Sequence, residues 1–184
     1  MARRADAKRC VVLIGFMGAG KTTVGRALAK RLHCDFFDLD DVIEQREQKS
    51  VAEIFAASGE AAFRRMESAA LTALLQEHSP SGDLVIALGG GAFVQKHNRA
   101  ALEAADAITV LLEAPLEELR RRCHDESKVR PLAQEQEKFN ELFAARRADY
   151  ELARFRVQTL GKPVKRIIAE IERLLTAAQA EVEE

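Results

Sequence analysis

Short apolar runs alternate with stretches of helical periodicity along most of this chain. The apolar runs predict strands over residues 10–14, 35–38, 84–88, 107–112 and 155–159. Strands of this kind, separated by helices, are typical of a parallel sheet that helices cover on both faces. The pattern therefore predicts an α/β fold of three αβα layers with a central five-stranded parallel sheet.

Helical periodicity fills the intervals between these runs. It predicts helices over residues 21–32, 40–48, 51–57, 60–78, 96–104, 116–123, 135–154 and 163–178. We expect one domain over residues 10–178, a disordered N-terminal tail over 1–9 and a frayed C-terminus over 179–184. The polar stretch 124–134 shows no packing pattern, and a polar loop of that length in a compact domain is often a mobile lid.

Composition limits the classes of protein that fit. The chain has 184 residues, which suits one domain, and its 47% hydrophobic and 31% charged residues exclude a disordered chain and give no membrane span. A net charge of −1 and the absence of Trp offer no basic or aromatic surface to nucleic acid. The three cysteines are scattered, which indicates reduced thiols of a cytoplasmic protein, and the four histidines lack metal-ligand spacing. We expect a monomer without nucleic-acid or membrane partners.

The most specific motif is GFMGAGKT over residues 15–22, which matches the phosphate-loop pattern G-x-x-x-x-G-K-[ST]. An apolar run precedes it and a helical period follows, which is the context that the motif needs. Its glycines let backbone N–H groups turn toward phosphate oxygens, and the helix N-terminus adds partial positive charge. Lys21 would reach the β- and γ-phosphates, and the Thr22 hydroxyl would ligate Mg²⁺. The motif predicts a P-loop NTPase type of fold; the alternative is a glycine-rich turn formed by chance.

Two acids follow the second predicted strand, in the segment FFDLD over residues 36–40. In an open parallel sheet, ligands bind at the carboxyl ends of the strands. A spacing of two places Asp38 and Asp40 on the same side of an extended chain. One could support the Mg²⁺ shell near Thr22, and the other could face a substrate hydroxyl. The alternative is a structural role in which Asp40 or Asp41 caps the next helix.

Three glycines, Gly89, Gly90 and Gly91, directly follow the third predicted strand. They leave room for a ligand to approach the backbone. A flexible turn is the alternative, although three consecutive glycines exceed what a turn needs.

Arginines form a further set of candidates. Arg64 lies on the helix predicted over 60–78, Arg130 lies in the polar stretch, and Arg146 precedes Tyr150 by four residues. An arginine fork suits a carboxylate or a transferring phosphoryl group. A single arginine on a helix, however, is usually a solvated surface residue.

Taken in order, the motifs GFMGAGKT, FFDLD, FRRME, LGGG, VRPL and RRADY resemble those of the shikimate kinase family, in the nucleoside-monophosphate-kinase-like group of phosphate-loop enzymes. The likeness runs from about residue 10 to residue 163. It implies an enzyme that uses ATP and Mg²⁺ to phosphorylate the 3-hydroxyl of shikimate, in aromatic amino-acid biosynthesis.

The resemblance also implies a role for each matching residue. ATP would be bound by Gly18, Ala19, Gly20, Lys21, Thr22, Thr23 and Arg130. Shikimate would be bound by Asp40, Arg64, Gly89, Gly90, Gly91 and Arg146, and Mg²⁺ by Thr22 and Asp38. The catalytic groups would be Asp40, Lys21 and Arg130. Asp40 would accept the hydroxyl proton, and Arg64 with Arg146 would clamp the substrate carboxylate. Arg130 would reach the ATP phosphates from the lid.

Residues 157–163 depart from the family pattern V-D-x-x-[NQ]-x-P, because they lack its acid and its amide. We therefore expect backbone contacts to adenine and loose discrimination between ATP and GTP. Two alternatives stay open at this point. One is another small-molecule kinase with a gluconate-like or aminoshikimate-like substrate, and the other is a nucleotide-binding regulator without activity. The presence of Lys21, Asp40 and Arg130 disfavours the regulator.

Overall fold

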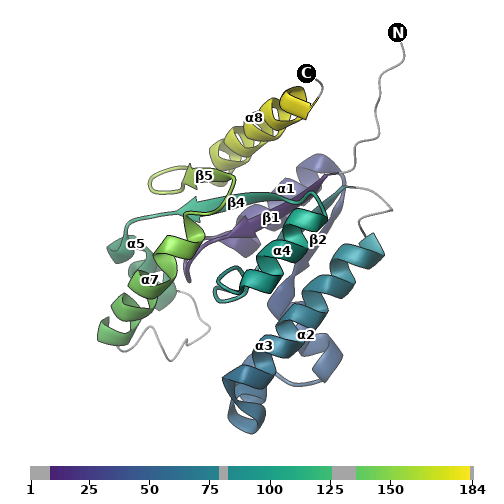
Figure 1. Ribbon diagram of the computed structural model, residues 1–184. Coiled ribbons are helices and arrows are strands. Elements are labelled where there is room, and N and C mark those ends of the chain that lie inside the picture. Colours follow the sequence, from purple (N-terminus) through teal and green to yellow (C-terminus); the bar gives the residue numbers. More distant parts are fainter. Residues whose placement is uncertain (1–8, 79–82, 126–135, 183–184) are drawn as a thin grey trace.

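Five parallel strands form the centre of the fold (Figure 1). The computed structural model describes residues 9–78, 83–125 and 136–182. The strands are β1 (Cys10–Ile14), β2 (Asp35–Asp38), β3 (Leu84–Ala87), β4 (Ile108–Glu113) and β5 (Phe155–Gln158). Their order across the sheet is β2-β3-β1-β4-β5, and each neighbouring pair is parallel. The predicted five-stranded parallel sheet is therefore confirmed.

The strand order places the most apolar strands at the centre of the sheet. Every residue of β1 and β3 is buried, whereas the edge strands β2 and β5 are only partly buried. A strand covered on both faces needs apolar side chains along its whole length. Because β1 pairs with both β3 and β4, the loops that follow β1 and β3 leave the same edge of the sheet side by side. Ligands bind at such an edge in open α/β sheets.

Helices form the two outer layers. They are α1 (Lys21–Leu32), α2 (Leu39–Glu47), α3 (Val51–His78), α4 (Lys96–Ala104), α5 (Leu116–Asp125), α7 (Gln136–Tyr150) and α8 (Val164–Val182). Helix α8 packs against α1, and α3 packs against α4. Figure 1 shows α8 on one side of the sheet and the α3–α4 pair on the other. The three-layer prediction therefore holds.

Most predicted boundaries agree with the structure within one or two residues. The break between the helices predicted over 51–57 and 60–78 is confirmed inside α3, where Gly59 has φ 75° and ψ 172°. The helix predicted over 135–154 is wrong at its end, because α7 stops at Tyr150. There the chain turns, and the Arg154 N–H donates to the Thr109 hydroxyl at 2.9 Å.

The chain ends also differ from the expectations. Helix α8 continues to Val182, so the C-terminus is helical beyond residue 178. At the other end, Arg9 is anchored by an ion pair with Asp83, which removes it from the expected tail. The rest of that tail, residues 1–8, lies outside the described residues.

The expected lid over 124–134 falls mostly on residues 126–135, which lie outside the described parts of the chain, and so does Arg130. Its first two residues, His124 and Asp125, belong to α5. Among the helices of the described residues, none is long and apolar enough to cross a membrane.

Candidate active site

The phosphate-loop motif forms a tight turn between β1 and α1. Gly18 and Gly20 have φ values of 76° and 91°, a backbone conformation that favours glycine. At Gly18, a Cβ would also meet the Leu119 carbonyl oxygen at 2.5 Å. Helix α1 begins without a side-chain cap and without an acidic residue in its first turn. Its first N–H groups therefore face the loop, as anion binding requires.

Lys21 and Phe16 fix the shape of this loop. The Lys21 ammonium donates to the carbonyl oxygens of Gly15 at 2.8 Å and Phe16 at 3.2 Å, which places its charge over the loop. The Phe16 ring is buried and packs edge-on against Phe139 and Phe143 of α7, at centroid distances of 5.0 and 5.3 Å. The loop is thus held against α7 as well as against the sheet.

Thr22 and Asp38 meet at the carboxyl end of β2. The Thr22 hydroxyl donates to Asp38 Oδ2 at 2.6 Å. The other oxygen, Asp38 Oδ1, accepts a hydrogen bond from the Asp40 N–H at 3.2 Å and caps α2. The prediction that Asp40 or Asp41 is the cap is therefore wrong. Asp41 instead forms an exposed ion pair with Arg26 at 3.7 Å.

Asp40 lies in the first turn of α2, so the predicted extended chain from Asp38 to Asp40 is also wrong. Its carboxylate still faces the site, because helix geometry turns it toward the end of β3. A Cβ on Gly89 would lie 2.6 Å from Asp40 Oδ1. Glycine at position 89 therefore makes room for this carboxylate.

The next two glycines make room for the two predicted arginines. A Cβ on Gly90 would lie 2.8 Å from an Arg146 guanidinium nitrogen, and one on Gly91 would lie 2.4 Å from the Arg64 guanidinium. Neither glycine has a positive φ, so space rather than backbone conformation requires glycine here. The segment 89–91 is therefore a surface against which charged side chains lie.

Arg64 is held between two carboxylates. It donates to Glu67 Oε2 at 2.9 Å and to Glu60 Oε1 at 3.2 Å. Burial acts against its charge, but these two acids outweigh it and raise the pKa of Arg64. Burial raises the pKa of Glu67, and Asp40 adds to this, while Arg64 opposes it. The site thus combines two acids and an arginine in a partly dehydrated space.

Arg146 reaches the site from α7, together with Tyr150. The Tyr150 hydroxyl donates to the Gly90 carbonyl oxygen. Burial raises the pKa of Tyr150 to about 12, although Arg146 acts to lower it. The neighbouring Arg147 is exposed and pairs with Glu151 at 3.3 Å. Arg146 therefore lies against the segment 89–91, whereas Arg147 lies at the surface.

A cavity of about 330 Å³ adjoins the phosphate loop between α1, α5 and the start of α8. It is lined by Gly18, Ala19, Gly20, Thr23, Val24, Arg122, Thr159, Lys162, Val164 and Ile167. Arg122 donates to the Thr159 hydroxyl at 3.1 Å and to the Gly18 carbonyl oxygen at 3.4 Å. Its guanidinium thus joins the phosphate loop to the segment after β5, at a place suited to a nucleotide base.

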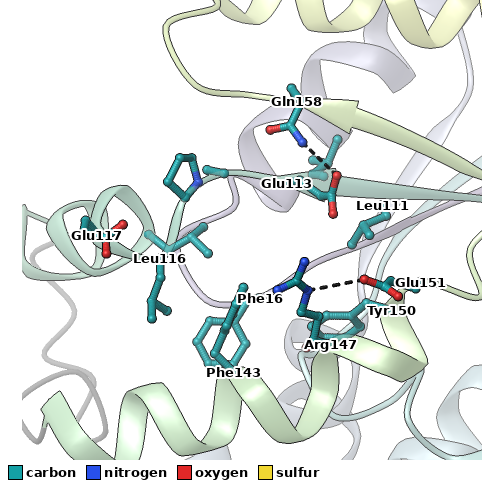
Figure 2. A pocket seen from close by; sticks show the side chains of 14 residues that line it. Phe16, Leu111, Glu113, Leu116, Glu117, Phe143, Arg147, Tyr150, Glu151 and Gln158 are labelled. Carbon is teal, nitrogen blue, oxygen red and sulfur yellow. Dashed lines mark hydrogen bonds and ion pairs between the residues drawn. The ribbon is translucent and has the colours of Figure 1, made fainter.

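A second cavity, of about 440 Å³, lies between the end of β4, α5 and α7 (Figure 2). Among the described residues, none of those predicted to bind substrate, ATP or Mg²⁺ lines it, although Phe16 and Tyr150 do. Figure 2 shows Arg147 turned toward Glu151 and Gln158 toward Glu113, so these polar groups pair with each other. We therefore place the active site at the phosphate loop and residues 89–91, not here.

Known proteins match this chain over most of its length. A family model described as "Shikimate kinase" matches residues 17–176. A shikimate kinase from Bacillus cereus (strain AH187) is 37% identical over 169 residues, which cover 89% of this chain and 96% of that protein. The chain belongs to the shikimate kinase family.

Solved structures agree with this membership. A shikimate kinase from Acinetobacter baumannii, solved in complex with shikimate, is 34% identical with a TM-score of 0.80, and the match covers 94% of this chain and 95% of that chain. A gluconokinase from Sinorhizobium meliloti 1021 is 17% identical with a TM-score of 0.59, and the match covers 95% of this chain and 97% of that chain. The likeness to the gluconokinase shows a shared fold alone. As a member of the shikimate kinase family, the chain is a kinase that uses ATP as its co-substrate.

Three residues of the candidate site were not predicted from the sequence. Glu67 and Tyr150 lie within the quoted motifs, and the spacing of three between Arg64 and Glu67 could have indicated their ion pair. Arg122 gave no signal, because its partners Gly18 and Thr159 are 104 and 37 positions away.

Proposed function

We propose that this chain transfers the γ-phosphoryl group of ATP to the 3-hydroxyl of shikimate, giving shikimate 3-phosphate and ADP for aromatic amino-acid biosynthesis. The observation that carries the proposal is the convergence of Asp40, Arg64 and Arg146 on residues 89–91, beside the phosphate loop. Membership of the shikimate kinase family supports it. One carboxylate and two guanidinium groups suit an acceptor that carries hydroxyls and a carboxylate.

The two arginines would hold the substrate carboxylate. Arg64 comes from α3 and Arg146 from α7, and they lie against the adjacent glycines Gly91 and Gly90. Two guanidinium groups that lie against neighbouring glycines can bind one carboxylate from two directions. This arrangement would fix the acceptor ring relative to the phosphate loop, and orientation of this kind supplies much of the acceleration in phosphoryl transfer.

Asp40 would accept the proton of the attacking hydroxyl. As the hydroxyl oxygen forms its bond to the γ-phosphorus, the bond from that phosphorus to the β–γ bridging oxygen breaks, and the proton passes to the Asp40 carboxylate. Lys21 would exchange the carbonyl oxygens of Gly15 and Phe16 for phosphate oxygens. Its charge would then stabilise the transferring group.

Thr22 and Asp38 suit Mg²⁺ as ligands or as supports of its hydration shell. Their hydroxyl and carboxylate oxygens lie 2.6 Å apart, and Mg²⁺ prefers oxygen ligands. The Asp38 carboxylate is also fixed by its cap on α2. When bound, Mg²⁺ neutralises negative charge on the phosphates.

Three further parts of the proposal rest on the sequence. Arg130 would add positive charge at the phosphates once the segment 124–134 closes over bound substrates. Thr23, beside Thr22, would contribute to ATP binding. We also propose that the chain works as a monomer in the cytoplasm, where reduced cysteines are the rule.

The deciding experiment measures ADP formation by the purified chain with ATP and Mg²⁺, with and without shikimate. We expect turnover to depend on shikimate, with slow hydrolysis of ATP in its absence. Gluconate, which also carries a carboxylate and hydroxyls, is the matched comparison. Turnover with gluconate but not with shikimate would overturn the proposal, and so would ATP consumption that ignores both compounds.

A further inference from the structure

Arg146 differs from Arg64 in how its position at the candidate site is fixed. Two ion pairs within α3 hold Arg64, whereas no ion pair of Arg146 occurs among the described residues. The Arg146 guanidinium instead lies over the Phe16 ring, 6.0 Å from its centroid, and donates a hydrogen bond to the Tyr150 hydroxyl. Its direction therefore depends on where α7 places it.

Apolar packing alone does not fix α7 closely. Of its 15 residues, Phe139 and Tyr150 are the two that are buried. A helix that packs against a sheet usually buries a continuous apolar stripe. The cavity of about 440 Å³ lies between α7 and the end of β4, so this helix is not in close contact with the sheet along its whole length (Figure 2). Polar contacts are therefore needed to set its position.

One such contact is the ion pair between Asp149 of α7 and Arg99 of α4. Asp149 Oδ1 lies 2.9 Å from Arg99 Nη1, and the two side chains are 28% and 18% exposed. The same guanidinium donates to the carbonyl oxygens of Phe93 at 2.7 Å and Val94 at 2.8 Å. These two residues belong to the backbone segment that continues from residues 89–91. Arg99 thus attaches the end of α7 to that segment.

The segment 90–94 is itself held in place at further points. Asn98 of α4 is 1% exposed, and its side-chain amide donates to the Ala92 carbonyl oxygen at 2.9 Å. From α7, the Tyr150 hydroxyl donates to the Gly90 carbonyl oxygen. The end of α7 is therefore attached on both sides of Ala92. Two attachments fix the rotation of a helix about its axis, whereas one attachment leaves it free to pivot.

We propose that Asp149 is a positioning residue for the acceptor substrate: through its ion pair with Arg99 it holds the end of α7 so that Arg146 lies against residues 89–91. Asp149 follows Arg146 by three positions on the same helix, so a shift at one moves the other. This inference rests on the proposed function, in which Arg146 binds the substrate carboxylate. A partly exposed ion pair adds little to stability, but a substrate-binding group loses much of its effect when it is displaced by about 1 Å.

The test compares Asp149→Ala with Glu151→Ala as the matched control. Each variant removes one acid near the end of α7 and breaks one ion pair, but Glu151 pairs with Arg147 of α7 itself and joins no other helix through that pair. For Asp149→Ala we expect the KM for shikimate to rise about five- to tenfold, while the KM for ATP stays within about twofold. For Glu151→Ala both KM values should stay within about twofold of wild type. An unchanged KM for shikimate in folded Asp149→Ala would overturn the inference.

Asp149→Asn is a second variant that keeps the size of the side chain and removes its charge. Its KM for shikimate should rise by a smaller factor, about three- to fivefold, because an amide oxygen accepts a weaker hydrogen bond from Arg99 than a carboxylate does. This variant decides the matter if Asp149→Ala does not fold. A wild-type KM for shikimate in Asp149→Asn would then contradict the inference.

A double variant tests whether Asp149 acts through Arg146. If it does, Arg146→Met combined with Asp149→Ala should have the same kcat/KM for shikimate as Arg146→Met alone. A structural role of the ion pair that is independent of Arg146 would lower kcat/KM further in the double variant. Such a further loss would contradict the proposed route.

Wild-type turnover separates this inference from the function on which it rests. A wild type that does not phosphorylate shikimate would overturn the proposed function and the inference with it. Shikimate-dependent turnover in the wild type, together with wild-type kinetics in both Asp149 variants, would overturn the inference alone.

Discussion

Asp40 is the residue on which the proposed proton transfer depends. We predict that Asp40→Asn keeps the fold and ATP binding but lowers kcat by about 10²- to 10⁴-fold, because the amide cannot accept the hydroxyl proton. Steady-state kinetics and a nucleotide titration measure the two effects. Asp41→Asn is the control, since Asp41 lies in the same first turn of α2 and forms an exposed ion pair with Arg26. Near-normal turnover in Asp40→Asn would remove Asp40 from this role.

Individual residues also show where sequence reasoning succeeds and fails. The phosphate loop was predictable, because its spacing fixes both the backbone turn and the position of Lys21. The extended chain predicted from Asp38 to Asp40 is wrong, because α2 begins between them at Leu39, and their roles at the site stay predictions. Glu67 was not predictable as a site residue, since its complete burial depends on how α3 packs against the rest of the molecule.

At the scale of elements, the end of β3 and the break in α3 use glycine for different reasons. Gly91 lacks space for a Cβ, which would lie 2.4 Å from the Arg64 guanidinium, whereas Gly59 has open space but a φ of 75°. We predict that Gly91→Ala displaces Arg64 and raises the KM for shikimate about 10- to 100-fold. Gly59→Ala should instead lower the free energy of unfolding by about 1–3 kcal/mol with unchanged KM values. Kinetics and urea unfolding of both variants measure this, and equal KM values for shikimate in the two variants would contradict it.

The junction of α5 with the phosphate loop gives a second prediction at this scale. Arg122 and Arg121 both donate to Glu118, and these bonds lower the pKa of Glu118 to about 2. Arg122 also donates to Gly18 and Thr159, which line the cavity beside the phosphate loop. Arg122→Ala should therefore raise the KM for ATP about tenfold, because the loss of one charged hydrogen bond weakens binding by about that factor. The KM for shikimate should stay unchanged. Arg121→Ala is the control, and the same KM for ATP in both variants would argue against a nucleotide role for Arg122.

Elements with a clear apolar period were predictable nearly to the residue. The bounds of β1, β2, α1 and α4 agree with the prediction, because each is an uninterrupted pattern between polar or glycine boundaries. The end of α7 was not predictable, since a long-range bond from Arg154 to Thr109 accompanies the turn that ends the helix. The junction through Arg122 was hidden for the same reason.

At the scale of the whole molecule, the parallel sheet explains why dispersed motifs form one site. The loops after β1 and β3 and the start of α2 all leave the carboxyl edge of the sheet, where β2, β3 and β1 are neighbours. Helices α3 and α7 then bring Arg64 and Arg146 to that edge from elements that are far apart in sequence. The location of the site thus followed from the predicted sheet, whereas its side-chain contacts required the packing of the helices.

The same central sheet makes the stability of the molecule depend on pH in alkaline solution. Cys10 begins β1 and is 6% exposed, and burial raises the pKa of its thiol from 9.0 to about 12. In the unfolded chain this thiol loses its proton near pH 9, while in the folded chain it keeps it to about pH 12. The unfolded state therefore binds fewer protons in that window, so the free energy of unfolding falls as the pH rises.

We predict that this thiol contributes a decline of at most about 1.4 kcal/mol per pH unit above pH 9. Urea unfolding at pH 8, 9, 10 and 11 measures the decline for wild type and Cys10→Val. The variant should lose stability less steeply, and the slope rather than the absolute value is compared, because Val also changes the packing. Cys34→Ser is the comparison: the Cys34 side chain is only partly buried and its pKa is raised to about 11, so its effect on the slope should be similar up to about pH 10 and smaller than that of Cys10→Val toward pH 11. Equal slopes for wild type and Cys10→Val would mean that the thiol in β1 titrates in the folded protein as it does in the unfolded chain.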